Sequence, residues 1–336
     1  MQAMKEWVAG LAAGLALCAH AGEVQVREAI GADMQAAFLR GDYQAIEGRY
    51  AAALATSERT PSGLFVADVI RRNIVPDPAT ESDVPGRDDH WVPMERKLDD
   101  WAAHFPQSSL VAVVQSWIYI RHGWAYRGGG YARTVPPEAF RKVEQYGQRA
   151  YDVLKEREKT GSQDPYWYVQ MMNVARVQGW EPDRFLALVQ QASRKFPLNY
   201  DIYFTPAIQL LPRWGGSTEA IAGLAAYAVD QTRKVEGESM YARVYWSVAG
   251  QLDAELSGPE VNWPRIRAGF EDVIKRYPES WNLNHYASMA CDARDVPTTR
   301  RVLLRIKGDI EQQAWKGRAH YLRCVEMAGL KKEALR

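Results

Sequence analysis

The chain has 336 residues, of which 47% are hydrophobic, so it is long enough to bury one large core or two ordinary ones. Its 42 basic and 41 acidic side chains nearly cancel, leaving a formal net charge of +1, and no long basic run occurs. This balance argues against nucleic acid and against an anionic membrane surface as partners.

The first segment, residues 1–21, has the pattern of a secretory signal peptide. Lys5 supplies a positive charge, an apolar run ending at Leu17 follows, and a small-x-small sequence ending at Ala21 offers a cleavage site. The run is shorter than the roughly 20 apolar residues of a membrane-spanning helix, and no later segment approaches that length. A lipid anchor on Cys18 is disfavoured because Leu17 stands where such sites need a small side chain. We therefore expect a periplasmic or secreted protein without stable membrane insertion after cleavage.

Composition divides the rest of the chain into three parts. Residues 22–75 predict an N-terminal helical region, and residues 76–90, rich in proline and acidic side chains, predict a linker. Residues 91–336 predict a helical-repeat domain. Two glycine-rich stretches within that domain, 127–130 and 212–216, predict loops.

Apolar residues in the repeat domain recur at helical spacing behind recognisable helix starts. Ser108 or Ser109, Asp164 before a proline, Ser217, and Asn262 are each a predicted N-cap. Helical stripes follow over 110–120, 143–154, 182–196, 221–228 and 266–277. The valines and isoleucines of 110–120 would also suit a buried strand, but their spacing favours a helix.

A basic residue or histidine, an aromatic residue and a proline occur in a row at three places, each at the end of an apolar helical pattern. The three motifs are His104-Phe105-Pro106, Lys195-Phe196-Pro197 and Arg276-Tyr277-Pro278. Proline cannot continue a helix, whereas the aromatic ring before it can fold back onto a helix pair. We therefore predict an all-α protein of antiparallel helix hairpins stacked in a tetratricopeptide-like superhelical array.

Removal of the leader leaves Cys291 and Cys324 as the remaining cysteines. Their separation is close to the ~34-residue period of a helix-hairpin repeat, which would place them at equivalent positions of neighbouring hairpins. In an oxidising compartment such a pair predicts a disulfide.

Several motifs carry a resemblance to a known family. These are Leu211-Pro212-Arg213-Trp214-Gly215-Gly216-Ser217, Glu236-Gly237-Glu238-Ser239-Met240-Tyr241-Ala242-Arg243, Trp124-Ala125-Tyr126-Arg127-Gly128 and the two cysteines. They resemble the exported bacterial family catalogued as domain of unknown function 4034, and the likeness covers most of the mature chain. The resemblance implies a tetratricopeptide-like array and brings no established reaction.

The sharpest local candidate for a site is the run from Arg213 through Trp214 to Ser217. Glycines there allow close backbone approach, and a helix N-terminus attracts anions, so Arg213 could be the charged arm of a small carboxylate site. A purely structural interpretation makes the run a tight turn between helices, in which Trp214 joins two hairpins and Arg213 pairs with a carboxylate such as Glu236 or Glu238. A second candidate, around Arg127, combines arginine, aromatic rings and glycines, although such residues also suit a helix C-terminus.

Glu236, Glu238 and Arg243 bracket a helix junction. Two neighbouring carboxylates could act as acid and base, but charges of this kind commonly serve only the helix dipole. His320 and Cys324 would share a helical face, with His285 and Cys291 on a preceding helix, so a mixed zinc site is conceivable. The disulfide is the simpler expectation, and we predict no metal and no cofactor.

Stacked hairpins form concave faces that serve recognition. We therefore expect a binding or scaffold protein of the bacterial envelope, with a protein or peptide partner. A hydrolase acting on envelope glycans or peptides, and a secreted toxin or its neutralising partner, remain the alternatives.

Overall fold

The computed structural model describes residues 22–77, 88–129, 132–252, 256–306 and 308–331. Within these residues the chain is all-α, as predicted, and its only extended pairing is an isolated bridge between Arg59 and Phe65. The predicted signal peptide, residues 1–21, and most of the predicted linker lie outside the described residues. No helix within the described ranges is long and apolar enough to cross a membrane.

The N-terminal helical region consists of α2 (Glu23–Arg40), α3 (Tyr43–Thr56) and α4 (Val66–Asn73). Each of these helices contacts the other two. Gly41 ends α2 in the left-handed conformation, and Asp42 then caps α3 by accepting a hydrogen bond from the Ala45 amide at 3.2 Å.

The remainder of the described chain forms a succession of helices joined mostly by short turns. These are α5 (Asp88–His104), α6 (Ser109–Arg127), α7 (Pro137–Glu156), α8 (Glu158–Gly161), α9 (Pro165–Gln178), α10 (Pro182–Lys195), α11 (Asp201–Gln209), α12 (Thr218–Glu236), α13 (Ser239–Val248), α14 (Trp263–Arg276), α15 (Ser280–Asp292), α16 (Val296–Ile306) and α17 (Arg318–Met327). Short 3-10 turns lie at Ala132–Thr134 (η1), Pro212–Trp214 (η2), Ala249–Gln251 (η3) and Gln312–Ala314 (η4).

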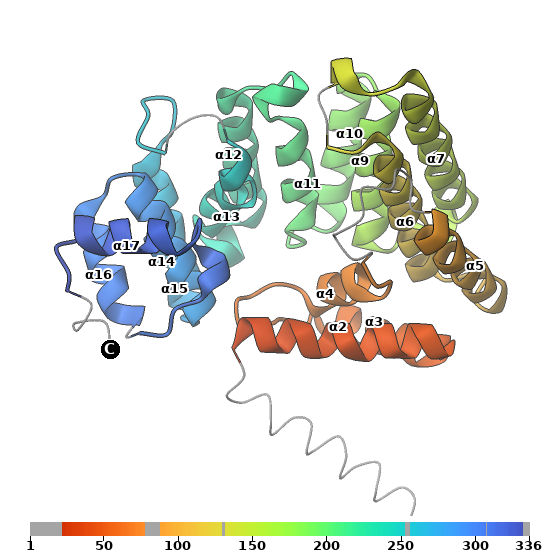
Figure 1. Ribbon diagram of the computed structural model, residues 1–336, viewed down its shortest axis with the longest axis horizontal. Coiled ribbons are helices and arrows are strands. Elements are labelled where there is room, and N and C mark those ends of the chain that lie inside the picture. The colour runs from red at the N-terminus through yellow and green to blue at the C-terminus, as the bar shows by residue number, and fades with distance from the viewer. Residues whose placement is uncertain (1–21, 78–87, 130–131, 253–255, 307, 332–336) are drawn as a thin grey trace, which may run out of the picture.

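These helices stack in sequence order. Each packs on helices next to it or next but one in the chain, and α11 contacts α9 on one side and α13 on the other. Figure 1 shows the resulting array as an arch, with α5 to α7 at one end and α14 to α17 at the other. Two hydrophobic cores fill the arch, and they meet at α11, where Ile202 belongs to the first and Tyr203 to the second. The predicted array of stacked hairpins is therefore confirmed.

Local signals place the helix ends where the sequence predicts them. Ser108, Asp164, Ser217 and Asn262 each accept a hydrogen bond from a backbone amide in the first turn of the following helix. Helices α5, α10 and α14 end at His104, Lys195 and Arg276, so that each proline of the three turn motifs lies outside a helix. Asp88 and Asp89, at the end of the predicted linker, already belong to α5.

Segment 110–120 is helical, as its spacing predicts. It lies within α6, where Leu110, Val111, Val113 and Val114 are all buried on more than one side of the helix. Because α6 contacts α4, α5, α7 and α9, it is apolar around most of its circumference. This burial explains its strand-like content of valine and isoleucine.

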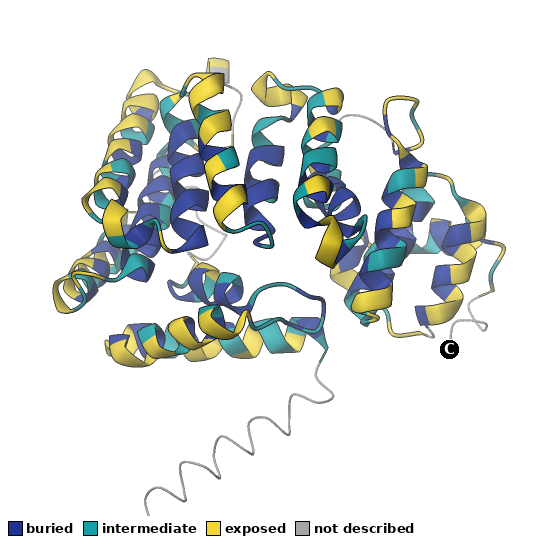
Figure 2. Cartoon of the chain, turned by 180° about the vertical axis from the view of Figure 1, so that it is seen from behind, coloured by how far each residue is buried: buried dark blue, intermediate teal, exposed yellow. Residues whose placement is uncertain are grey.

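The N-terminal helices lie across the open side of the arch, as Figures 1 and 2 show from opposite sides. Helix α4 contacts α6 of the array, while the outer faces of α2 and α3 are largely exposed. The concave side of the array is therefore covered in part by the protein's own N-terminal region.

Candidate binding cleft

The loop at 57–65, between α3 and α4, connects the N-terminal region to helices α13 and α15 in the second half of the array. The Ser62 carbonyl accepts hydrogen bonds from Arg243 Nη2 and from Asn282 Nδ2, each at 3.1 Å. The next residue, Gly63, has a φ of 91°, and a Cβ placed there would lie 2.5 Å from the Tyr277 ring. Only glycine fits this position, because both the backbone conformation and the close approach exclude a side chain.

Glu23, at the start of α2, anchors the same loop from its other side. Its carboxylate is fully buried and accepts hydrogen bonds from Thr60 Oγ1 at 2.9 Å and from the Ser62 amide at 2.8 Å. Arg27 Nε pairs with it at 2.5 Å. A buried charge is tolerated only when it is paired and hydrogen-bonded, and these contacts meet that condition.

Helices α4 and α11 are joined by a network of two arginines and two aspartates. Arg71 pairs with Asp68 at 2.5 Å and with Asp201 at 2.7 Å, and Arg72 pairs with both aspartates. Burial raises the pKa of Asp68 to about 6, although Arg71 and Arg72 act in the opposite direction. Burial acts to raise the pKa of Asp201 too, but Arg72 and Arg71 together hold it below its usual range.

A cleft of about 400 Å³ lies between the 57–65 loop and the ion-pair network of α4 and α11. Its walls come from α2 and α4 on one side and from α11, α13 and α15 on the other. The lining residues are Arg27, Ser62, Leu64, Asp68, Arg72, Asp201, Phe204, Arg243, Trp246, Ser247 and Trp281. A second hollow of about 480 Å³ between α2 and α4 is lined by four of the same residues, Arg27, Leu64, Asp68 and Arg72, so the two adjoin each other.

Arg243 is the most unusual residue of the cleft. It is only 2% exposed, and its guanidinium stacks on the Tyr200 ring at 4.9 Å. Its Nε is buried and has no hydrogen-bond partner among the described residues. The same is true of Asn282 Oδ1 and His285 Nε2, on α15 beside the cleft. Unpaired buried polar atoms cost roughly 1–3 kcal/mol each, so these three atoms reduce the stability of the free protein.

Trp246 and Trp281 line the same cleft as Arg243, and together with the His285 ring they form an aromatic wall. The His285 ring lies between Trp246 and Trp281, with ring centroids 4.4 and 4.6 Å away, and the Arg27 guanidinium stacks on Trp281 at 4.7 Å. Burial lowers the pKa of His285 to about 3, helped by repulsion from Arg27. The cleft therefore combines indole surfaces with guanidinium donors, and the neutral imidazole packs against both indoles without lining the cleft itself.

Of the predicted site residues, only Arg243 lines this cleft. Glu236 is buried behind it, where it accepts hydrogen bonds from Tyr200 Oη at 2.8 Å and Ser239 Oγ at 3.0 Å. Glu238 instead pairs with Arg233 and with Arg265, at 2.5 and 2.9 Å. Both glutamates thus have structural partners within the protein.

Arg213 and Ser217 lie at the other end of α12 from Glu236. A helix of this length places its two ends about 27 Å apart, so Arg213 cannot share a pocket with Glu236. Ser217 acts as the N-cap of α12 through a 3.1 Å bond from the Ala220 amide. The pairing of Arg213 with Glu236 or Glu238, one interpretation of the sequence, does not occur, because Arg213 Nη2 donates to Gln251 Oε1.

The structure does bring Arg127, Arg213 and Trp214 together. The Trp214 ring lies edge-on to Trp124, with centroids 6.4 Å apart, and the Arg127 guanidinium lies 5.2 Å from the Trp124 ring. Arg176 of α9, which the sequence did not single out, approaches the same ring at 6.0 Å. We call these five residues the Arg–Trp cluster.

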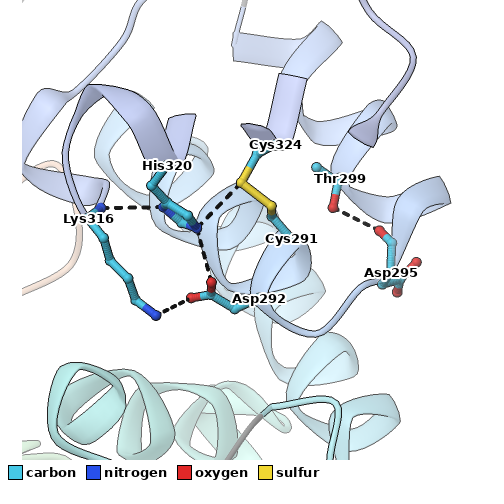
Figure 3. Close-up of a disulfide and its surroundings, with 7 residues drawn as sticks. All are labelled: Cys291, Asp292, Asp295, Thr299, Lys316, His320 and Cys324. Carbon is cyan, nitrogen blue, oxygen red and sulfur yellow. Dashed lines mark hydrogen bonds and ion pairs between the residues drawn. A yellow bond between two sulfur atoms is a disulfide. The ribbon is translucent and has the colours of Figure 1, made fainter. Parts of the chain in front are cut away.

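Cys291 and Cys324 form the predicted disulfide between α15 and α17 (Figure 3). His320 lies beside it: its Nε2 is 3.4 Å from Cys324 Sγ and 3.0 Å from Asp292 Oδ1. The donor atoms of both cysteines and His320 lie within 4.8 Å of one another, but in the disulfide the two sulfurs bond each other. His285 lies in the aromatic wall of the cleft and is not part of this group.

Sequence reasoning did not find Arg27, Asp201, Trp246 or Trp281 as neighbours. The two tryptophans belong to a heavy aromatic load of 12 tryptophans and 17 tyrosines, which does not say which rings line a cavity, and no sequence pattern marks Arg27 or Asp201. The comparisons give no further guide, since no family model, curated protein or solved structure matches this chain.

Proposed function

We propose that this protein is an exported binding protein whose cleft holds a segment of a protein or peptide partner. The observation that carries the proposal is Arg243, a buried guanidinium that lines the cleft with an unbonded Nε. Its described bond goes to a neutral backbone carbonyl of Ser62. A buried guanidinium without a carboxylate is a ready donor for a ligand oxygen.

The remaining walls indicate the rest of the ligand. Trp246, Trp281 and Phe204 offer apolar surface next to Arg243. A cavity of about 400 Å³ is in the usual range for ligand pockets, and it suits one or two residues of a peptide. The ligand we propose presents a carboxylate or carbonyl oxygen beside an apolar side chain.

Export to the periplasm or beyond is part of the same proposal. It is supported by the leader pattern of residues 1–21 and by the disulfide, which persists in oxidising compartments. The resemblance to the exported family of unknown function points the same way.

Selection from a random displayed peptide library on the mature protein tests the proposal. Selected peptides are synthesised, and their Kd is measured by fluorescence anisotropy against wild type, Arg243→Gln and Arg267→Gln. Arg267 is the matched control, because it is exposed on α14 and pairs with Asp295 outside the cleft. We expect at least tenfold weaker binding to Arg243→Gln alone, with unchanged circular dichroism. Equal affinity for all three proteins would refute the assignment of the cleft.

One observation favours the hydrolase alternative in a new place. Asp68 and Asp201 both line the cleft, and their pKa values are shifted in opposite directions. Carboxylates with separated pKa values can divide the roles of acid and base. Hydrolysis of envelope glycan or peptide fragments by wild type but not by Asp68→Asn would support it. The ion pairs with Arg71 and Arg72 explain the same shifts structurally, so we rank binding first.

A further inference from the structure

The Arg–Trp cluster gathers cationic and indole groups from three elements. Trp124 and Arg127 come from the last turns of α6, Arg176 from the end of α9, and Arg213 and Trp214 from η2. The Arg213 guanidinium lies 5.8 Å from the Trp214 ring. None of the five lines the cleft described above.

The positive charge of this cluster is not neutralised at Arg176 and Arg213. Neither residue forms an ion pair with a carboxylate within the described chain, and Arg213 donates instead to the neutral amide of Gln251. Burial lowers the pKa of Arg176, and repulsion from Arg213 lowers it further. Two guanidinium groups close enough to repel each other are costly unless an anion joins them.

Two donors in the cluster also lack acceptors. Arg176 Nε and Trp124 Nε1 are buried and have no hydrogen-bond partner among the described residues. Arg127 differs, because its Nη1 donates to the Gly128 carbonyl at 3.0 Å. Trp214, in contrast, is 46% exposed and presents a large apolar surface at the rim.

We propose that the Arg–Trp cluster is a binding site for an oxyanion, a carboxylate or a phosphate, attached to an apolar group. The oxyanion accepts from the guanidinium groups of Arg176 and Arg213 and from the indole N–H of Trp124. The apolar group packs against the exposed ring of Trp214. Guanidinium groups hold planar or tetrahedral oxyanions through paired hydrogen bonds, and indole supplies both a donor and a flat apolar face. This site stands apart from the cleft and does not depend on the function proposed for it.

If the arginines of the cluster served only to stabilise the fold, we would expect them to be exposed and stacked closely on tryptophan. Stacking of arginine on tryptophan stabilises a fold at exposed positions, as where Arg184 lies 3.3 Å from the Trp180 ring. Arg176 is half-buried, its guanidinium lies 6.0 Å from the Trp124 ring, and Arg213 repels its charge. Its placement is costly for the free protein and favourable once an anion is bound.

Titration of the mature protein with phenyl phosphate, phenylacetate and the neutral analogue 2-phenylethanol tests the proposal. Indole N–H resonances of Trp124 and Trp214 are assigned with Trp→Phe variants and followed by ¹H–¹⁵N NMR. We expect saturable shifts with one or both anions and none with the alcohol. The anion that binds with the lower Kd then identifies the ligand class, phosphate or carboxylate.

Three variants make the result specific. Arg213→Gln, at an exposed position that leaves folding intact, and Arg176→Gln should each weaken anion binding at least tenfold. Arg184→Gln is the matched control and should bind as wild type. In the absence of anion, Arg176→Gln should raise the melting temperature because it removes the repulsion.

Each contrary outcome overturns the site. Shifts that do not saturate, that appear equally with the neutral analogue, or that survive in Arg213→Gln would all show that no oxyanion site exists. A fall in melting temperature of Arg176→Gln, together with unchanged binding by Arg213→Gln, would assign the cluster to stability alone.

Discussion

His285 should make the protein sensitive to mild acid. Its imidazole has a pKa of about 3 in the folded protein, because Nε2 is buried between two tryptophans and Arg27 repels a positive charge there. In the unfolded chain the pKa returns to about 6.5. As the pH falls through 6.5, His285 therefore becomes protonated in the unfolded chain but stays neutral in the folded protein. The free energy of unfolding decreases as a result.

The size of this effect follows from the difference in pKa. At pH 5 the solution is about 1.5 units below the pKa of the histidine in the unfolded chain. At 1.36 kcal/mol per unit, protonation stabilises the unfolded chain by about 2 kcal/mol. Asp68 acts in the opposite direction: its raised pKa of about 6 means that the folded protein takes up a proton first on acidification. The stability of the wild type alone therefore mixes two opposed contributions, and a comparison between variants is needed to separate them.

Urea unfolding of wild type and His285→Gln at pH 7.5 and pH 5.0, followed by far-UV circular dichroism, isolates the histidine. We expect the difference in unfolding free energy between the two proteins to change by about 2 kcal/mol between these pH values, in favour of the variant at pH 5.0. Asp68→Asn serves as a control with the opposite sign. If the difference between wild type and His285→Gln is the same at both pH values, the imidazole is not held neutral by burial and the account of the aromatic wall fails.

Further predictions concern the disulfide, the loop and the cores. Cys324→Ser should lower the free energy of unfolding by about 4 kcal/mol on a chain-entropy basis, which chemical denaturation in the absence of reductant can measure. Gly63→Ala should cost at least 1–2 kcal/mol, because it forces a side chain into a φ of 91°, and should raise hydrogen exchange at 57–65; unchanged exchange there would contradict the loop's role. Phe270→Ala should cost about 3–5 kcal/mol, because that ring is fully buried. Phe196→Ala should cost distinctly less, because Phe196 keeps part of its surface exposed; equal losses in melting experiments would refute this ranking.

The helix boundaries could be predicted because they depend on residues close in the chain. Asp164 caps α9 through an amide two residues away, and Ser217 caps α12 through one three residues away. The turn motifs act through the covalent geometry of proline, which no distant contact can alter. The disulfide was predictable for a related reason, since the repeat period itself brings equivalent positions together.

The cleft could not be predicted, because it is made by contacts between residues far apart in the chain. Arg71 meets Asp201 across 130 positions, and Ser62 accepts from Arg243 and Asn282 across 181 and 220 positions. No local sequence pattern predicts contacts between residues so far apart in the chain. Arg213 and Glu236 were both candidate site residues, but they lie at opposite ends of helix α12 and therefore cannot form one site.

Local sequence patterns were therefore enough to predict that this chain is a stack of α-hairpins, where most of its helices start and stop, and which two cysteines form a disulfide. These follow from caps, prolines and apolar spacing, which act over a few residues or over one repeat. Long-range packing, in contrast, places the N-terminal helices over part of the concave side of the arch (Figure 1). It alone also left Arg243 buried with an unbonded Nε, and brought Arg176 and Arg213 together around two tryptophans. Burial and charge pairing depend on which surfaces meet, and that is settled only when the whole chain has packed.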